Sequence, residues 1–223
     1  MKGLLKNNVY AVLSNAKLSN AKLFSAMMLV LGIFVVGIDH DAQIFIIGYM
    51  LLCMTGFSVI AAASLRRESV SKWSKYKLTA PIRRTDIVKS YFLSQMAWLC
   101  IGMLLAGTAA ALSILFYGFP FDKDTDIFMV YVVGIGLSLF MGAIFFPLFY
   151  LGGEERSEML IGGSLLGGIG VIMGASSLMN RWFGPHMTAF QIMTAGAAIL
   201  VCALLAFFLS FLLTVRIFQK KEL

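Results

Sequence analysis

Charged residues are scarce in this chain. They make up 13% of its 223 residues, whereas soluble globular domains usually carry about 25%. Hydrophobic residues reach 60%, and the mean hydropathy is +0.88. This balance excludes a water-soluble globule and predicts an integral membrane protein. Because a spanning helix needs roughly 20 apolar residues, the length allows about six spans and leaves no room for a separate soluble domain.

The long apolar stretches lack acidic and basic side chains altogether. Ion-coupled carriers usually keep an ionisable residue in the membrane, because the coupling ion needs a site. A phosphate-binding loop is missing as well, since the sequence contains no Gly-Lys pair. We therefore expect neither ion-gradient coupling nor ATP hydrolysis by the chain itself, and no catalytic residue or bound cofactor.

Residues that commonly bind metals are also few. The two histidines, His40 and His186, fall in expected outer loops, on the opposite side of the membrane from the acidic turn at Glu154. This separation argues against a metal site and against an intramembrane metalloprotease. Three cysteines lie in apolar stretches without metal-like spacing, and we expect them to be buried thiols: Cys53, Cys100 and Cys202.

Six charge-free stretches are present, and each predicts a membrane helix. They are Leu23–Ile38, Ala42–Leu65, Ser90–Phe121, Ile127–Gly153, Met159–Asn180 and Trp182–Val215. The expected fold is all-α, a single polytopic domain with six transmembrane helices at about residues 23–38, 42–65, 90–117, 127–150, 159–179 and 188–214. The first stretch has 16 residues and reaches only about 24 Å, so it should borrow residues from the segment before it.

Residues 1–22 form the basic segment before the first stretch. Leu5, Val9, Val12 and Ala16 fall on one helical face, with lysines and asparagines mostly elsewhere around the helix. This spacing predicts an amphipathic elbow helix that lies on the inner leaflet.

Basic residues are distributed unevenly among the connections. Sixteen of the 18 Lys and Arg residues fall in segments 1–22, 66–89, 154–158 and 216–223, and the opposite side holds only Lys123 and Arg181. Because basic loops stay in the cytoplasm, both termini are expected inside the cell. Basic residues beside apolar stretches favour contact with anionic lipid over nucleic acid.

Small residues recur at intervals of four within the spans, which lets a neighbouring helix approach closely. The sets are Gly102–Ala106–Ala110, Gly134–Ser138–Gly142, Gly163 with Gly167, and Gly170 with Gly174. Packing within one bundle explains all of them. A dimer seam or a mobile contact at the glycine-rich fifth span is the alternative.

The segment from Arg66 to Lys89 is the longest polar stretch. It carries eight basic residues and two acidic ones, interleaved with Trp73 and Tyr76. These two aromatic side chains lie three residues apart, on one face of an expected short helix. They either sit at the lipid headgroup boundary or dock into a soluble partner, because large aromatic residues are favoured anchors at protein contacts.

This segment also carries a family resemblance. The pattern resembles the second cytoplasmic segment of ABC-2-type exporter permeases, and it consists of Glu68, Lys72-Trp73, Tyr76, Pro81-Ile82 with Arg83 or Arg84, and Ile87-Val88. The likeness covers nearly the whole chain and includes Pro147-Leu148-x-Tyr150 and Gly153-x-Glu155. It is greatest for a small six-span subgroup that includes bacterial exporters of amphipathic peptides such as phenol-soluble modulins. The chain departs from that subgroup at Leu151, Glu158 and Tyr91-Phe92.

The resemblance implies that residues 68–77 form a coupling helix, which docks on a separate ATPase that binds the ATP and Mg. The implied docking residues are Glu68, Ser71, Lys72, Trp73, Lys75, Tyr76 and Lys77, with Glu154 and Glu155 as a smaller contact. Two permease chains, expected as a homodimer, would pair with two ATPases in the bacterial plasma membrane.

In related exporters the second and fifth spans tend to face the central path. The resemblance therefore implies that soft apolar side chains line this path and suit amphipathic cargo such as peptides: Met50, Met54, Phe57 and Met173. Core packing explains these side chains at least as well. The alternative function is a non-transporting immunity or sensor protein whose basic loop binds lipid or a cytoplasmic partner.

Overall fold

The computed structural model describes residues 20–36, 43–70, 84–118, 121, 123–153, 156–184 and 187–220. Nearly all of these residues are helical, and there is no strand among them. The helices are α2 (Asn20–Val36), α3 (Gln43–Val70), α5 (Arg84–Tyr117), α6 (Asp124–Gly152), α7 (Ser157–Phe183) and α8 (Ala189–Lys220). The expected all-α fold is therefore confirmed.

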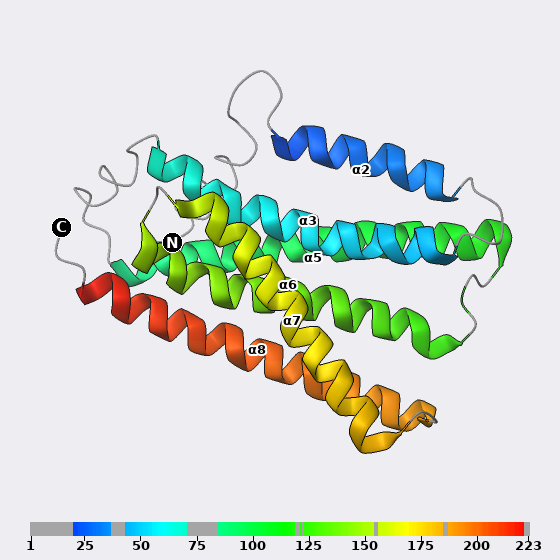
Figure 1. The fold of residues 1–223 in the computed structure, drawn as a ribbon. Coiled ribbons are helices and arrows are strands. Elements are labelled where there is room, and N and C mark those ends of the chain that lie inside the picture. Colours follow the sequence, from blue (N-terminus) through cyan, green and yellow to red (C-terminus); the bar gives the residue numbers. More distant parts are fainter. Residues whose placement is uncertain are drawn as a thin grey trace.

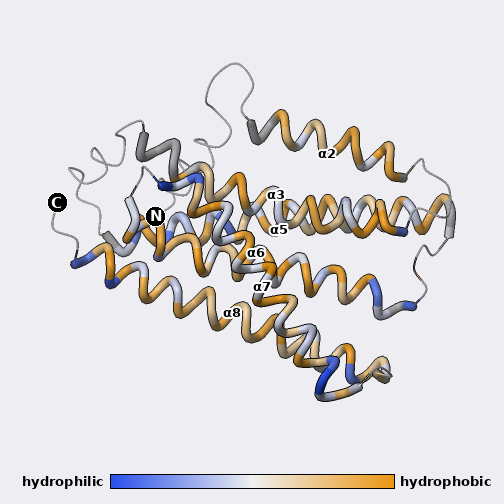
Figure 2. The backbone as a smooth tube through the Cα atoms, in the orientation of Figure 1, coloured by the Kyte–Doolittle hydropathy of each residue, from blue (hydrophilic) through white to orange (hydrophobic). Residues whose placement is uncertain are grey.

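Five of these helices, α3 and α5 to α8, are long and apolar enough to cross a membrane. The apolar part of α2, Leu23–Val35, is shorter. Figure 2 shows apolar residues along the middle of the helices and hydrophilic residues gathered at their ends. This distribution is that of a polytopic membrane protein, because the hydrocarbon layer tolerates apolar side chains and the interfaces accept charge.

The helices form one bundle around α3, α5 and α6. In Figure 1, α5 runs behind α3, α2 lies along an edge, and α7 crosses diagonally in front of α6. Helix α6 packs on α8, α7 and α3, while α2 packs on α3 and α5. The largest fully buried side chains come mostly from these three helices and include Phe57 of α3, Gln95 of α5 and Phe145 of α6. The core therefore lies at the junction of α3, α5 and α6.

Glycine follows the last residue of three long helices: Gly118 after α5, Gly153 after α6 and Gly184 after α7. Gly153 and Gly184 have φ values of 78° and 73°, a region that side chains with a Cβ rarely adopt. Their backbone N–H groups donate to the carbonyls of Phe149 and Asn180, at 3.1 Å and 3.0 Å. Each glycine thereby satisfies one carbonyl at the end of its helix and turns the chain toward the next.

Helix α8 begins with a reciprocal cap. The backbone N–H of Thr188 donates to Gln191 Oε1 at 3.0 Å, and the N–H of Gln191 lies 3.4 Å from Thr188 Oγ1. A threonine followed three residues later by glutamine is a known start signal, because the two side chains satisfy two otherwise unpaired N–H groups. The local sequence thus fixes where the last helix starts.

The helices differ from the expected spans mainly at their ends. Helix α3 continues to Val70, α5 begins at Arg84, and α8 continues to Lys220. Arg181, expected in an outer loop, lies in the last turn of α7 instead. Charged residues can continue a helix beyond the hydrocarbon, and α7 ends only at Gly184, which Pro185 follows in the sequence.

Candidate functional site

Helices α3, α5 and α6 meet at a buried polar contact, which we call the polar seam: Met54, Gln95 and Ser138. Gln95 Nε2 donates to the backbone carbonyl of Ser138 at 2.9 Å. Ser138 Oγ donates in turn to the backbone carbonyl of Met54 at 3.0 Å. All three side chains are fully buried. The polar seam therefore joins three membrane helices through two hydrogen bonds, a type of contact that stabilises helix association in lipid.

Small residues on α6 make the polar seam possible. A Cβ at Gly142 would collide with the carboxamide of Gln95, and a Cβ at Gly134 would collide with the side chain of Met54. Ser138 lies between the two glycines and supplies the hydrogen bond to α3. The predicted close-packing face Gly134–Ser138–Gly142 is therefore confirmed.

The small-residue face of α5 packs in the same way. A Cβ at Gly102 would lie 2.7 Å from the carbonyl oxygen of Cys53 on α3. Ala106 and Ala110, one and two turns further along, are buried. The backbones of α3 and α5 therefore approach closely here, as the spacing Gly102–Ala106–Ala110 predicted.

One turn of α5 carries polar atoms that lack a protein partner. Ser94 Oγ, Gln95 Oε1 and Trp98 Nε1 are buried and have no hydrogen bond to any described residue. The indole of Trp98 stacks on Phe57 of α3, with ring centroids 5.8 Å apart. An unsatisfied buried polar group costs about 1–3 kcal/mol. This turn was not predicted from the sequence, where its only signal is a glutamine and a tryptophan inside an apolar stretch.

Pro147 interrupts the hydrogen bonding of α6 and is compensated by α8. Proline has no N–H, so the carbonyl of Ala143, four residues earlier, loses its helical partner. Ser210 Oγ on α8 donates to this carbonyl at 2.7 Å. Helices α6 and α8 are thus joined at the proline, because a neighbouring side chain supplies the donor that the proline removes.

The four residues expected along a path do not lie together. Met50, Met54 and Phe57 of α3 are fully buried in the core, whereas Met173 of α7 is 67% exposed. The side chain of Met54 lies against Gly134 of α6. In this structure the three residues of α3 pack the core, which was the alternative interpretation of these positions.

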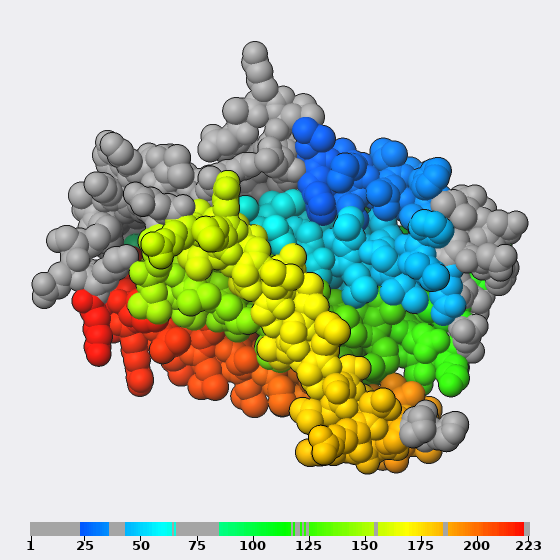
Figure 3. Space-filling model, viewed as in Figure 1, coloured from blue at the N-terminus to red at the C-terminus, as the bar shows by residue number. Residues whose placement is uncertain are grey.

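Helix α7 presents most of its surface outward, and Figure 3 shows it crossing one face of the molecule. No atom lies within 4 Å of a Cβ built at Gly163, Gly170 or Gly174, and Gly167 meets Ile144 of α6 at 3.0 Å. The buried side of α7 instead carries Ser157, Ser164 and Gly168. Packing within the described chain therefore accounts for Gly167 but not for the other three expected glycines.

The outward face of α7 is apolar as well as open. Large hydrophobic side chains are exposed along its whole length, and they include Met159, Leu166, Met173, Leu178 and Trp182. We call the surface formed by Gly163, Leu166, Gly170, Met173 and Gly174 the α7 face. It combines bulky apolar residues with glycines that leave room for a close neighbour.

Most of the expected docking residues lie outside the described residues. These are Ser71, Lys72, Trp73, Lys75, Tyr76 and Lys77, together with Glu154, Glu155 and the amphipathic segment 1–19. Glu68 lies in the last turn of α3. The end of α3, the start of α5, the start of α7 and the end of α8 lie toward the same end of the bundle (Figure 1).

The cysteines differ from the expectation at two positions. Cys53 of α3 is buried, as predicted, but Cys100 and Cys202 are exposed on the surfaces of α5 and α8. Thiols in an apolar stretch can face lipid as readily as protein, because both surroundings are apolar. Apolar context alone therefore did not distinguish the two.

The comparisons with known proteins agree with this architecture. A family profile described as ABC-2 family transporter protein matches residues 3–219. No curated protein and no solved structure matches the chain. The family match covers α2 to α7, the connection between α3 and α5, and all of α8 except its last residue, Lys220. The chain therefore belongs to the ABC-2 family of transporter proteins, as a membrane-spanning permease.

Proposed function

We propose that this permease exports amphipathic or hydrophobic cargo, peptides in the first place, using ATP that a separate subunit hydrolyses. The family match over residues 3–219 carries the proposal. The absence of a Gly-Lys phosphate loop supports it, because such a chain needs a motor supplied in trans. The bacterial plasma membrane, with both termini in the cytoplasm, is the proposed location, since sixteen of the 18 basic residues fall on that side.

The ATPase is proposed to dock on the segment from Glu68 to Lys77, with Glu154 and Glu155 as a second contact. Trp73 and Tyr76 are the proposed anchors, because aromatic side chains carry much of the energy of protein contacts. Residues 71–83 connect the end of α3 to the start of α5. A push on this segment would therefore act directly on the two helices that share the polar seam.

A second copy of the chain is proposed to cover the α7 face. The glycines Gly163, Gly170 and Gly174 would let its backbone approach, and Leu166 and Met173 would supply apolar contact area. Cargo would pass between the two copies, beside this contact. The unpaired polar atoms at Ser94, Gln95 and Trp98 would take new partners as α5 moves.

A pull-down from native membranes in mild detergent tests this function. Tagged wild-type protein is compared with the double variant Trp73→Ala/Tyr76→Ala, and co-eluting proteins are identified by mass spectrometry. The control is Trp182→Ala/Phe183→Ala, which removes two aromatic residues at the far end of α7. We expect an ATPase to co-elute with the wild type and the control but not with the Trp73/Tyr76 variant. That variant should still insert in the membrane, but its ATP hydrolysis should no longer drive transport.

Either of two results would contradict the proposal. If well-folded wild-type protein retains no nucleotide-binding partner, the proposal that a separate ATPase drives transport is rejected. An ATPase that binds the Trp73/Tyr76 variant as well as the wild type, with normal coupled transport, would leave the transporter intact and reject the docking residues.

A further inference from the structure

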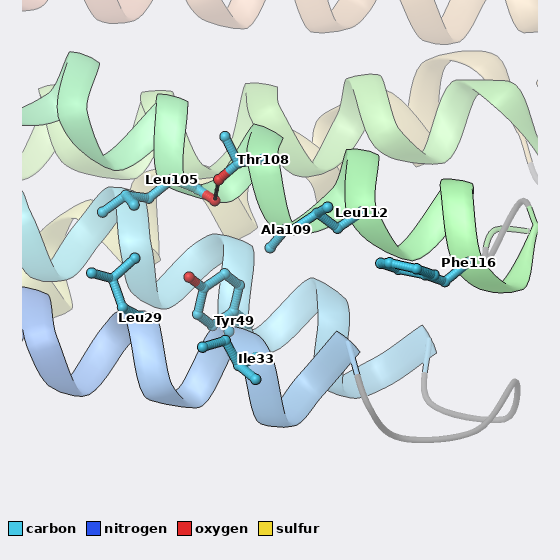
Figure 4. Close-up of a pocket in the computed structure, with 9 residues that line it drawn as sticks. Leu29, Ile33, Tyr49, Leu105, Thr108, Ala109, Leu112 and Phe116 are labelled. Atoms are coloured by element: carbon cyan, nitrogen blue, oxygen red, sulfur yellow. Dashed lines mark hydrogen bonds between the residues drawn. The ribbon is translucent and has the colours of Figure 1, made fainter.

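A pocket of 230 Å³ opens between α2, α3 and α5 (Figure 4). Its floor includes Tyr49 of α3 and Ala109 of α5, which are buried. Its rim includes Ile33 of α2 and Leu112 and Phe116 of α5, which are 75%, 46% and 67% exposed. A buried floor with an exposed rim makes this a hollow in the outer surface of the bundle, distinct from the polar seam and from the α7 face.

The pocket lies wholly within apolar membrane segments. Every lining residue belongs to Leu23–Val35 of α2, Gln43–Ala63 of α3 or Thr85–Phe116 of α5. It is situated toward the end of the bundle where α2 and α5 end and α3 begins. The rim therefore faces lipid hydrocarbon rather than water, and the material that reaches the pocket first is an acyl chain.

The two polar side chains in the pocket are already engaged. Tyr49 Oη donates to the carbonyl of Met28 at 3.1 Å. Figure 4 shows the second bond, in which Thr108 Oγ1 donates to the carbonyl of Leu105 at 2.9 Å. Neither hydroxyl proton is free for an occupant. A peptide backbone or a lipid headgroup would lose hydrogen bonds here, because an unpaired polar group in an apolar site is costly. The pocket therefore favours a hydrocarbon chain over a polar occupant.

We propose that this pocket binds one acyl chain of a membrane lipid. Sites for drug-sized ligands usually measure about 300–1,000 Å³, so a pocket of 230 Å³ takes a segment of one chain. Helix α2 approaches α3 so closely that a Cβ at Gly32 would lie 2.7 Å from the hydroxyl of Tyr49. The acyl chain fills the remaining space between α2 and α5 and completes the packing of this edge helix.

Photo-crosslinking tests the assignment. The purified full-length protein is reconstituted in vesicles of phosphatidylethanolamine and phosphatidylglycerol that contain a trace of phospholipid with a diazirine in its acyl chain. After illumination, adducts are located by mass spectrometry. Reference positions that simply face lipid are Met193 and Val201 on α8, which are 51% and 55% exposed. We expect adducts on Ile33, Leu112 and Phe116 at a level several-fold above the reference positions.

Two variants narrow the pocket, and a third is the matched control. Ala109→Phe fills the floor, and Thr108→Leu adds bulk at an exposed lining position. The control Leu104→Phe places the same phenylalanine on α5 at an exposed residue outside the lining. The filling variants should reduce pocket adducts several-fold and leave those on α8 unchanged, while the control should match the wild type. If Ala109→Phe does not fold, Thr108→Leu alone tests whether the acyl chain occupies the pocket.

Several outcomes overturn the proposal. Equal labelling of pocket and reference positions would mean that the pocket residues meet only the surrounding bulk lipid and no bound acyl chain. Pocket labelling that both filling variants leave intact would place the adducts outside the pocket. Unlabelled pocket residues beside labelled α8 residues would mean that protein covers this surface, as either a second copy or another segment of this chain.

Discussion

Helices α6 and α7 follow one another in the chain, have similar lengths and are both apolar, yet they occupy opposite environments. In the most apolar part of α6, 50% of the residues are buried within the chain. In the corresponding part of α7, only 11% of the residues are buried. Helix α6 takes part in hydrogen bonds with α3, α5 and α8 through Ser138, Gln95 and Ser210. On α7, Ser164 donates to the carbonyl of Ile161 in its own helix.

This contrast separates two uses of small residues in a membrane protein. On α6, Gly134 and Gly142 already have neighbours, so they hold one chain together. On α7, Gly163, Gly170 and Gly174 have open space beside them, so the same residue type remains available for a contact outside the chain. Substitutions at matched glycines should therefore have opposite effects.

The largest effect is expected at Gly142. Valine at this position would collide with the carboxamide of Gln95 and break its bond to Ser138. Overpacking together with the lost interhelical bond should lower the free energy of unfolding by about 3 kcal/mol. The thermal unfolding midpoint in detergent measures this loss, and an unchanged midpoint would show that α5 and α6 do not meet there.

A smaller loss of stability is expected for Ser210→Ala, at the contact where α8 supplies the hydrogen bond that Pro147 of α6 cannot make. Ser210→Ala should cost about 1–2 kcal/mol, because it leaves the carbonyl of Ala143 without a donor. In the background Pro147→Ala the same change should cost much less, since alanine restores the helical N–H. A double-mutant cycle by denaturant titration measures the coupling.

The control for that cycle is Ser164→Ala on α7. Among the described residues its hydroxyl bonds only to its own helix, so the change should be nearly neutral. If Ser210→Ala costs the same free energy of unfolding in the wild type and in Pro147→Ala, the serine does not compensate for the N–H that Pro147 lacks.

The smallest effect, with the opposite sign, is expected at Gly170. Alanine there meets no neighbouring atom and favours the helix by up to about 1 kcal/mol, so the isolated chain should be equally or slightly more stable. Pairing of two copies should weaken, because the added methyl group separates the backbones. Unfolding of monomeric protein and size measurement by light scattering report the two effects separately, and marked destabilisation of the monomer would contradict the open position of Gly170.

The sequence predicted where the helices lie better than it predicted which helices pack against one another. Charge-free stretches located all the described membrane helices, because hydrocarbon excludes charge. Their ends were harder to place, since Arg84 and Lys220 continue helices past the apolar stretches. Spacing of small residues was equally clear on α6 and α7, but it reports only that close approach is allowed. Which face meets a partner depends on the arrangement of the other helices.

The polar contacts show the same limit. The proline at position 147 implies that the carbonyl of Ala143 needs a donor, and this much follows from the sequence. That Ser210 supplies the donor, 67 residues later in the chain, depends on the packing of α8 against α6. Gln95 is likewise visible as a polar residue in an apolar stretch, although its partner is a backbone carbonyl that no residue pattern identifies.

Cysteine cross-linking of the α7 face tests whether a second copy of the chain covers this surface. In a background with Cys53, Cys100 and Cys202 replaced by alanine, single cysteines are placed at Leu166 or Met173 and compared with Leu205 on α8, which is 56% exposed. Oxidation in native membranes forms a disulfide only when two copies bring these positions within about 7 Å. We expect covalent dimers for Leu166→Cys and Met173→Cys but not for Leu205→Cys. Dimers through Leu205 alone, or none through α7, would contradict a dimer contact at the α7 face.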